Sequence, residues 1–502
     1  MLYNSTQNAS EIVSSAQAIA QGISKDGGLF VPQEFPKYGE ADFKTLLGED
    51  YKGRAKKVFS DFLTDFSAEE IEACVDSAYT AEKFGSENPA PLAYTKLDGV
   101  PLNILELWHG PTCAFKDMAL QILPHLLTRS LKKTCDGKDA VILVATSGDT
   151  GKAALEGFKD VEHTKIIVFY PVNGVSPMQK HQMNTQEGKN VNVCAIKGNF
   201  DDAQTGVKRI FTTPEISEKL AENNMLFSSA NSINWGRLLP QIVYYISAYC
   251  DLVNDGKIAF GDPINVVVPT GNFGNILASY YASLMGLPIK KFICASNSNN
   301  VLTDFIKTGV YDKNRQFYTT MSPSMDILVS SNLERLLYNL TGNDDKATRA
   351  WMNALKGEGK YEVTEEVKSV IGKKFYGGFC DDRQTQATIN RLFTQESYLC
   401  DTHTAVAVGV YEQYVRETGD LTPSVIASTA SPYKFSKAVL EAVAPDIDLP
   451  ETEFEMVDKL NELTGMPVPA PLAGLKDKTA RFSAVTEPDA MREFVLSALG
   501  ID

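Results

Sequence analysis

The sequence predicts an α/β fold whose β-sheets are parallel and covered by helices on both faces. Two observations lead to this prediction. Short, continuous apolar runs recur along the chain, which is typical of strands that are buried on both faces. Helix-like segments separate these runs, and such alternation is characteristic of parallel sheets. The expected strands are residues 141–145, 166–170, 191–195, 266–268, 292–295 and 424–428.

Residues up to about Tyr94 differ from this pattern and are predicted to form a mainly helical N-terminal module. Within it, Phe66 followed by Ser67-Ala68-Glu69-Glu70 predicts a hydrophobic staple and a capping box at the start of one helix. The α/β alternation begins near Pro101.

Lys116 lies where a strand-like segment passes into a helix-like one. Residues 103–108 are expected to form a short buried strand, and residues 109–112 a turn. Apolar residues then recur at helical spacing, and Pro124 predicts a kink or an early end of that helix. The helix dipole and an apolar flank both favour the neutral amine, which is able to form a Schiff base. Taken alone, one lysine among 48 Lys and Arg residues is a weak signal.

Two further segments repeat the order of strand, glycine-bearing turn and helix. In the first, residues 139–145 precede a turn at 147–151; in the second, residues 266–268 precede a loop at 270–275. Glycines permit a close approach to a ligand, and free N–H groups at a helix start bind anions. Each loop is therefore a candidate anion site, although an ordinary capped connection remains the alternative for each. The chain lacks GxxxxGK followed by Ser or Thr, and GxGxxG after a strand, which argues against ATP and NAD.

These segments resemble the pyridoxal-phosphate enzymes of the tryptophan-synthase-β type (fold type II) and, within them, the threonine synthases. HGPTCAFKDMALQ is similar to the family's Schiff-base segment, ATSGDTG to its substrate-carboxylate and cofactor loop, and PTGNFGN to its cofactor-phosphate loop. SSANSINWGR, DGGLFVP and STASPYKF also match. The resemblance runs in order from about Tyr3 to about Arg481 and includes the family's spacing.

The resemblance implies a two-lobed fold with the following boundaries. Residues 1–94 are the N-terminal module, and residues 95–133 and 220–460 are the larger, cofactor-binding lobe. Residues 134–219 are the smaller lobe, inserted within the larger one. The more polar segment 311–378 is expected to be a peripheral insertion, and 461–502 an extended tail that ends in a helix.

The resemblance also implies that pyridoxal 5'-phosphate is the cofactor. Lys116 would hold it as a Schiff base and then transfer protons, and Asp149, where relatives often have asparagine, would lie near its phenolic oxygen. Thr429 would hydrogen-bond the pyridine nitrogen; a hydroxyl there leaves the nitrogen largely unprotonated, which favours elimination over transamination. The cofactor's phosphate would be bound by Gly271, Asn272, Phe273, Gly274 and Asn275.

The implied substrate is O-phospho-L-homoserine, which carries a carboxylate and a phosphate. Its phosphate would be bound by Ser232, Asn234 and Arg237, with Thr150 and Lys152 as weaker candidates, because a guanidinium with hydroxyl and amide donors suits phosphate oxygens. A solvated helix-face arginine is the alternative for Arg237. The substrate carboxylate would be bound by the turn that contains Ser147, Gly148, Thr150 and Gly151.

The implied reaction is γ-elimination of phosphate followed by addition of water at the β-carbon, which gives L-threonine in the last step of its biosynthesis. Three rival hypotheses remain: a serine/threonine dehydratase of the same fold, a cofactor-binding homologue without turnover, and a phosphatase of hydroxyl-amino-acid phosphates. The dehydratases lack the N-terminal module and usually the NSINWGR pattern.

Composition agrees with a metabolic enzyme of more than one domain. The chain has 502 residues, 43% of them hydrophobic, and a formal net charge of -15, which argues against nucleic acid and anionic membranes as partners. The eight cysteines form no CxxC pair and the five histidines no ligand spacing, so no metal site or disulfide framework is expected. Without a targeting segment or a membrane-length apolar run, we expect a cytoplasmic monomer or homodimer that acts on a small molecule.

Three residues near Lys116, and Gln7 near the start of the chain, carry smaller expectations. Cys113 departs from the apolar residue expected there, and packing is favoured over a reactive thiol. His109 is expected to support the Lys116 turn, and Asp117 to favour the helix dipole or to orient Lys116. Gln7 stands where the family usually has arginine, so the role of that arginine is not carried over.

Overall fold

The structure is a computed structural model that describes residues 1–135, 137–146, 148–173 and 175–501. Its larger sheet has the strand order β14-β11-β10-β15-β5-β4, and every neighbouring pair is parallel except β4 with β5. The predicted α/β fold with parallel sheets is therefore confirmed. The strands are β4 (Leu92–Leu97), β5 (Val100–Glu106), β10 (Ile264–Pro269), β11 (Ile289–Ser296), β14 (Phe375–Phe379) and β15 (Ser424–Ser428).

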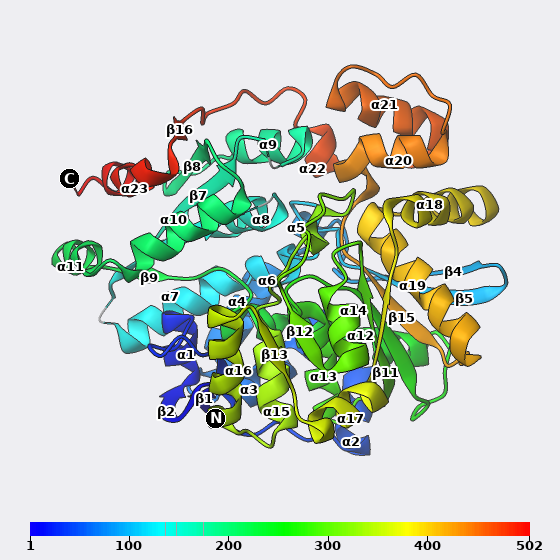
Figure 1. Cartoon of the computed structure of the whole chain (residues 1–502), viewed down its shortest axis with the longest axis horizontal. Coiled ribbons are helices and arrows are strands. Elements are labelled where there is room, and N and C mark those ends of the chain that lie inside the picture. The colour runs from blue at the N-terminus through cyan, green and yellow to red at the C-terminus, as the bar shows by residue number, and fades with distance from the viewer. Residues whose placement is uncertain (136, 147, 174, 502) are drawn as a thin grey trace.

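A second, entirely parallel sheet has the order β16-β8-β7-β6-β9 and forms the smaller lobe (Figure 1). Its outer strands, β9 and β16, come from beyond residues 134–219, so this sheet draws on more of the chain than expected. The strands are β6 (Asp139–Ala145), β7 (Thr164–Pro171), β8 (Val191–Ile196), β9 (Met225–Ser228) and β16 (Val485–Thr486).

Helices cover both sheets. Outside the N-terminal module and the segment 311–378, the helices up to the end of β15 are α6 (Asp117–Leu120), α7 (Leu123–Thr134), α8 (Asp149–Phe158), α9 (Pro177–Asn184), α10 (Phe200–Thr212), α11 (Pro214–Glu222), α12 (Trp235–Asn254), α13 (Gly274–Leu284), α14 (Val301–Thr308), α18 (Asp382–Glu396) and α19 (Thr402–Thr418). The predicted interruption near Pro124 is present, because α6 ends at Leu120 and Pro124 lies in the first turn of α7. Among the described residues, no helix is long and apolar enough to cross a membrane.

Successive strand residues enter different cores, which explains the continuous apolar runs. Val266 and Val268 pack in the core that contains α13, whereas Val267 between them packs in the core that contains α19. In the smaller sheet, Ile142 packs with α8 while its neighbour Val141 packs with α10. Because side chains alternate between the faces of a strand, two covered faces require apolar residues at every position.

The N-terminal module is mainly helical but also contains an antiparallel sheet, order β2-β1-β3, that the sequence did not predict. These strands are short and partly polar, so no apolar run marks them. The predicted capping box is present, with Ser67 and Glu70 exchanging hydrogen bonds at the start of α4. The elements are β1 (Leu2–Ser5), β2 (Asn8–Ser14), α1 (Ser15–Gln21), β3 (Phe30–Pro32), α2 (Glu40–Leu47), α3 (Tyr51–Phe62), α4 (Ala68–Ala78) and α5 (Ala81–Phe84).

The segment 311–378 is less peripheral than expected. Its end enters β14, an edge strand of the larger sheet, and Ser324 within it hydrogen-bonds Lys116. Part of its polarity serves hydrogen bonds to the half-buried Asp326, which accepts from Asn297 and Thr320, whereas many polar residues between 342 and 374 are exposed. Its elements are β12 (Val310–Asp312), η1 (Pro323–Met325), α15 (Leu333–Leu340), α16 (Asp345–Gly357), β13 (Lys360–Glu362) and α17 (Glu365–Lys374).

The tail after residue 460 runs from the larger lobe across the smaller one, in red in Figure 1. Arg481 donates to the carbonyl of Gln186 at 2.7 Å, β16 pairs with β8, and α23 enters the smaller lobe's core. The tail therefore links the two lobes. Its elements, with those that precede it, are η2 (Pro432–Phe435), α20 (Ser436–Val443), α21 (Glu453–Thr464), α22 (Ala470–Ala473), η3 (Pro488–Ala490) and α23 (Met491–Leu499).

Candidate active site

Three loops follow adjacent parallel strands and meet at one edge of the larger sheet. Lys116 lies after β5, Thr429 directly after β15, and the loop 271–275 after β10. The N–H of Phe115 donates to the carbonyl of Thr429 at 2.8 Å, which joins two of these loops. In open α/β sheets, ligands bind beyond the carboxyl ends of the strands, and this edge is such a place.

Lys116 presents a nearly buried amine to this edge. Its side chain is 11% exposed, and Nζ lies 3.4 Å from Oγ of Ser324 and 3.8 Å from Oδ2 of Asp149. Burial lowers the pKa of Lys116 to about 8, aided by the positive charges of Arg237 and Lys434, although Asp149 opposes this shift. Part of the population is therefore the neutral, nucleophilic amine near neutral pH.

Asp149 is held by a lysine that the sequence analysis did not single out. Oδ1 of Asp149 lies 2.6 Å from Nζ of Lys434, and Nε2 of Gln179 donates to the same oxygen at 2.9 Å. Burial alone would raise the pKa of Asp149, but Lys434 and Lys116 together hold it well below its ordinary value. Asp149 is therefore a carboxylate, with Lys434 completely buried beside it.

The turn after β6 is shaped by Thr146 and two glycines. The Thr146 hydroxyl accepts hydrogen bonds from the N–H groups of Gly148 and Gly151, both at 2.9 Å. Gly148 has φ of +136°, and a Cβ there would lie 2.3 Å from the Gln179 side chain, so only glycine fits. Thr150 is half-buried in the first turn of α8, whereas Ser147 lies outside the described residues.

Lys152 is engaged elsewhere. Its Nζ lies 2.9 Å from Oε2 of Glu156 and also hydrogen-bonds Gln186. Burial lowers the pKa of Lys152, while Glu156 opposes the shift. With its charge balanced by Glu156, Lys152 is not free to meet an anionic ligand in this arrangement.

In the loop 271–275, the N–H groups are free, whereas two of the carbonyls accept hydrogen bonds from side chains. The carbonyl of Gly271 accepts from the Ser330 hydroxyl at 2.7 Å, and that of Asn272 accepts from Nδ2 of Asn332 at 3.0 Å. Among the described residues, none of the N–H groups of 271–276 has an acceptor. Phe273 has φ of +63°, a left-handed conformation that starts α13.

One side chain of this loop, that of Asn275, also lacks full pairing. Asn275 accepts from the Tyr245 hydroxyl, while its buried Nδ2 has no partner among the described residues. A Cβ at Gly274 would make ordinary contacts, 3.4 Å or more from the neighbouring atoms. Free amides at a helix start, with an unpaired amide donor beside them, form a place for a phosphate group.

Arg237, in the first turn of α12, is a buried cation without a carboxylate. It is 4% exposed, and its Nη1 donates to the carbonyl of Ala230 at 2.7 Å. No carboxylate of the described residues forms an ion pair with it. Burial lowers the pKa of Arg237 to about 10, so it remains charged. A buried, charged guanidinium with no anionic partner suits an anionic ligand.

Ser232 and Asn234, which were predicted to bind the substrate phosphate together with Arg237, have different hydrogen-bond partners. Ser232 is half-buried, and its hydroxyl accepts from Nδ2 of Asn332 at 2.9 Å, which ties it to the loop 271–275. Asn234 is fully buried and caps α12: Oδ1 accepts from the N–H of Gly236, and Nδ2 donates to the carbonyls of Ile19 and Ser229. In this arrangement, its side-chain groups bind backbone groups of α12, of the preceding turn and of α1.

Besides Lys434, three residues that contribute to the candidate site were not predicted from the sequence. Ser324 contacts Lys116, and His403 accepts from the Ser324 N–H at 3.1 Å. Arg335 is fully buried and donates to Oδ1 of Asn332 and the carbonyl of Ile233, which braces the anion-binding loops. Lys434 lies in STASPYKF, which matched the family, and that was the available signal; the segment containing Ser324 and Arg335 carried none.

The residues around the Lys116 turn are structural. Burial raises the pKa of the Cys113 thiol to about 12, so Cys113 is a packing residue. Asp117 accepts from the N–H and the hydroxyl of Thr112 at 2.8 and 2.7 Å, and thus closes the turn. His109 hydrogen-bonds Glu106 at 2.8 Å. Gln7 donates to Oε1 of Glu334 at 2.9 Å, away from Lys116.

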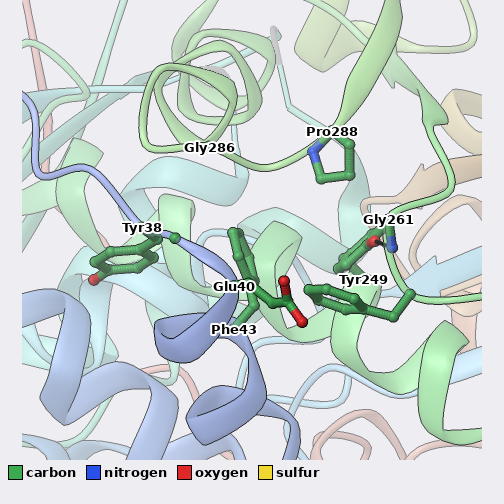
Figure 2. A pocket seen from close by; sticks show the side chains of 9 residues that line it. Tyr38, Glu40, Phe43, Tyr249, Gly261, Gly286 and Pro288 are labelled. Atoms are coloured by element: carbon green, nitrogen blue, oxygen red, sulfur yellow. Dashed lines mark hydrogen bonds between the residues drawn. The ribbon is translucent and has the colours of Figure 1, made fainter.

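A separate hollow of about 210 Å³ lies beside α2, α12 and the loop after α13. Figure 2 shows the side chains that line it. It is lined by aromatic side chains, and the ring of Phe43 lies 6.0 Å from those of Tyr38 and Tyr249. It shares no residue with the predicted site. Among the described residues, no group of three or more His, Cys, Asp or Glu side chains could hold a metal ion.

Three family models match the chain in order. "Threonine synthase N terminus" matches residues 2–79, "Pyridoxal-phosphate dependent enzyme" residues 85–430, and "Threonine synthase, C-terminal" residues 404–495. A threonine synthase of Schizosaccharomyces pombe is 37% identical over 466 residues, which cover 87% of this chain and 88% of that protein. The chain belongs to the threonine synthase family.

Other members of the threonine synthase family are also similar. The crystal structure of pyridoxal-phosphate-bound threonine synthase from Brucella melitensis superposes with a TM-score of 0.86, 36% identity and 99% coverage of both chains. The protein "Threonine synthase-like 1" of Homo sapiens is 42% identical over 85% of this chain. This chain covers only 58% of the length of that human protein.

The family's cofactor is pyridoxal phosphate, and the site fits it. The free N–H groups of 271–276 and the unpaired Nδ2 of Asn275 suit its phosphate, and the partly neutral amine of Lys116 suits its carbonyl carbon. These are two different chemical requirements, and the three loops meet both at one edge of the sheet.

Proposed function

We propose that the protein is a threonine synthase, a lyase that converts O-phospho-L-homoserine and water to L-threonine and phosphate as the last step of threonine biosynthesis. The observation that carries the proposal is Arg237, a buried guanidinium without a carboxylate partner, close enough to lower the pKa of Lys116. The loop 271–275 accounts for the cofactor's phosphate. The turn after β6 is assigned to the substrate carboxylate. A further anion site is needed only if the substrate itself carries a phosphate.

Within this proposal, different loops bind the cofactor, the substrate carboxylate and the substrate phosphate. Residues 271–275 hold the cofactor's phosphate, Thr429 faces its ring nitrogen, and Asp149 lies near its phenolic oxygen. Gly148, Thr150 and Gly151, with Ser147, bind the substrate carboxylate. Arg237 and Ser232 bind the substrate phosphate, while Asn234 holds the start of α12 on which Arg237 stands. Lys152 contributes least, because Glu156 already pairs with it.

Lys116 performs the proton transfers. The bound cofactor supplies an electron sink that stabilises negative charge at the substrate's α-carbon. Nζ of Lys116 takes the α-proton and, with a pKa near 8 in the free protein, is able to return a proton in a later step. Arg237 stabilises the phosphate that leaves from the γ-carbon, because the charge on that group increases as its bond breaks. A β-proton leaves as the phosphate departs, and the γ-carbon takes up a proton. The oxygen of water then adds at the β-carbon, and the α-carbon regains its proton.

The same proposal includes where the protein works. All eight cysteines are free thiols, which is usual in reducing compartments and supports a cytoplasmic location. We propose that it acts there on a small-molecule substrate as a monomer or homodimer.

The experiment that tests the function is an incubation of the cofactor-loaded protein with O-phospho-L-homoserine, during which threonine and phosphate are measured together. Equal amounts of both products are expected. Homoserine with phosphate would indicate a phosphatase, and a 2-oxo acid formed from serine or threonine would indicate a dehydratase. Cofactor binding without any product would indicate a homologue that binds without turnover.

Two variants assign the roles. Lys116→Ala is expected to abolish both products, and full activity of this variant would refute the proposed role of Lys116. Arg237→Ala is expected to lower kcat/KM for O-phospho-L-homoserine by at least about thirtyfold, corresponding to about 2 kcal/mol for a buried charge partner. Its cofactor absorbance should remain. Arg209→Ala, which removes an exposed arginine paired with Asp489, is the control and should change neither.

A further inference from the structure

A fully buried carboxylate, Asp401, lies at the start of α19 and organises two branches of hydrogen bonds. Oδ2 accepts from the N–H and from Nδ1 of His403 at 2.9 and 2.7 Å, and Oδ1 accepts from the N–H of Thr404 at 3.1 Å and from its hydroxyl. A carboxylate partner at Nδ1 keeps the imidazole proton there. Nε2 of His403 is therefore left as a hydrogen-bond acceptor.

The first branch leads to Lys116. Nε2 of His403 accepts from the N–H of Ser324 at 3.1 Å, and the Ser324 hydroxyl lies 3.4 Å from Nζ of Lys116. The imidazole is 2% exposed and packs against Phe435, with ring centroids 5.0 Å apart. A backbone N–H donates only to an imidazole nitrogen with a free lone pair, so this contact requires the neutral ring.

The second branch leads to the other side of the site. The Thr404 hydroxyl, whose proton is directed to Asp401, lies 2.9 Å from the Ser428 hydroxyl, and Ser428 accepts from Nε1 of Trp108 at 3.1 Å. Ser428 ends β15 and directly precedes Thr429. One buried carboxylate is therefore connected to both sides of the position proposed for the cofactor.

The loop that carries Ser324 does not depend on His403 for its overall shape. Asp326 accepts from Thr320 and Asn297 at 2.8 and 2.7 Å, and Asn297 also donates to Ser322. The contact with His403 acts on the Ser324 peptide itself. Loss of this contact is thus expected to free one peptide beside Lys116 while the loop stays folded.

We propose that Asp401 and His403 are positioning residues that hold Ser324 against Lys116, so that its hydroxyl accepts from the amine and its peptide keeps water away from Nζ. The inference rests on the proposed function only in taking Lys116 as the reactive amine. The groups whose charges face Lys116 are Asp149, Asp117, Arg237 and Lys434, and none of them belongs to this chain of hydrogen bonds.

The test compares His403→Leu with His403→Gln in the cofactor-free protein. Glutamine offers Oε1 as an acceptor where Nε2 stood, whereas leucine offers none. The readout is the pH dependence of Lys116 acetylation by acetic anhydride, measured by mass spectrometry, with circular dichroism as a check on folding. No substrate is used, so a failure of the proposed function, seen as absence of threonine, is a separate result.

We expect the midpoint for Lys116, near 8 in the unmodified protein, to rise by about 1 unit in His403→Leu, because water relieves the desolvation that lowers it. His403→Gln should keep the original midpoint. The proposal is overturned if His403→Leu leaves the midpoint unchanged, or if His403→Gln shifts it as far as leucine does.

If His403→Leu does not fold, a second pair of variants tests the same proposal. Ser324→Pro removes the N–H donor from the other side of the same contact, and Ser324→Ala keeps it. A raised midpoint for proline but not for alanine supports the proposal. Equal midpoints for these two variants overturn it.

Discussion

Replacement of Lys434 by methionine would leave Asp149 buried without its main partner. The two groups are 2.6 Å apart, and their side chains are 0% and 3% exposed, so solvent screens the pair very little. Removal of one partner from such a buried pair costs about 3–5 kcal/mol, because the remaining charge is uncompensated. Methionine fills similar space, so we expect the loss of unfolding free energy to come from charge and from the lost bond to the Thr112 carbonyl.

The same substitution should also change Lys116. Lys434 lowers the pKa of Lys116, and Asp149 raises it from 3.8 Å away. Without Lys434, both effects favour the charged amine, so the pKa of Lys116 should rise. The double variant Asp149→Asn/Lys434→Met removes the buried carboxylate together with its main partner, and asparagine retains an oxygen for Gln179. Lys116 also loses Asp149 in this variant, which favours its neutral amine. We therefore expect the double variant to recover most of the lost stability.

The assay is urea unfolding of the unmodified protein, both single variants and the double variant at neutral pH. Lys476→Met is the matched control, because it breaks an exposed pair with Asp458, 2.9 Å long, and should change stability by less than about 1 kcal/mol. A loss below about 1 kcal/mol for Lys434→Met would refute the reasoning. So would a double variant as unstable as Lys434→Met alone.

Three further outcomes are expected. Below pH 8, the rate constant for cofactor association should fall about tenfold per pH unit, because the neutral fraction of Lys116 falls in that proportion. Gly271→Ala should weaken cofactor affinity by about tenfold, since its Cβ would lie 2.6 Å from the carbonyl oxygen of Ser324; a titration of cofactor absorbance measures this. A maleimide should modify Cys113 far more slowly than the half-buried Cys135, because Cys113 is buried with a pKa near 12.

A specific result would contradict each of these three predictions. A cofactor association rate that does not change below pH 8 would show that Lys116 is not the titrating group. Gly372→Ala, at a helical position with open space around it, is the control for Gly271→Ala and should leave cofactor affinity unchanged. Similar affinities for the two alanine variants, or equally fast modification of the two thiols, would contradict the structure.

The sequence by itself determined the elements and the turns whose causes are local. The apolar run of β6 predicted its bounds because both faces of a parallel strand are buried. Ser67 and Glu70 predicted a helix start because their hydrogen bonds span three residues. The position of Lys116 between a strand and a helix, and the glycines of the loop 271–275, likewise depend on neighbours in the chain.

Only the tertiary structure decided which charges meet. Lys434 pairs with Asp149 across 285 residues, as the difference of their numbers shows, and Ser324 reaches Lys116 across 208. Sequence spacing carries no information on such contacts, because strand order brings the loops together. The same reason explains why Lys152 was expected at a phosphate but pairs with Glu156, and why the segment of Ser324 was taken for an insertion. Burial then determines the pKa values, and burial is a property of the packed molecule.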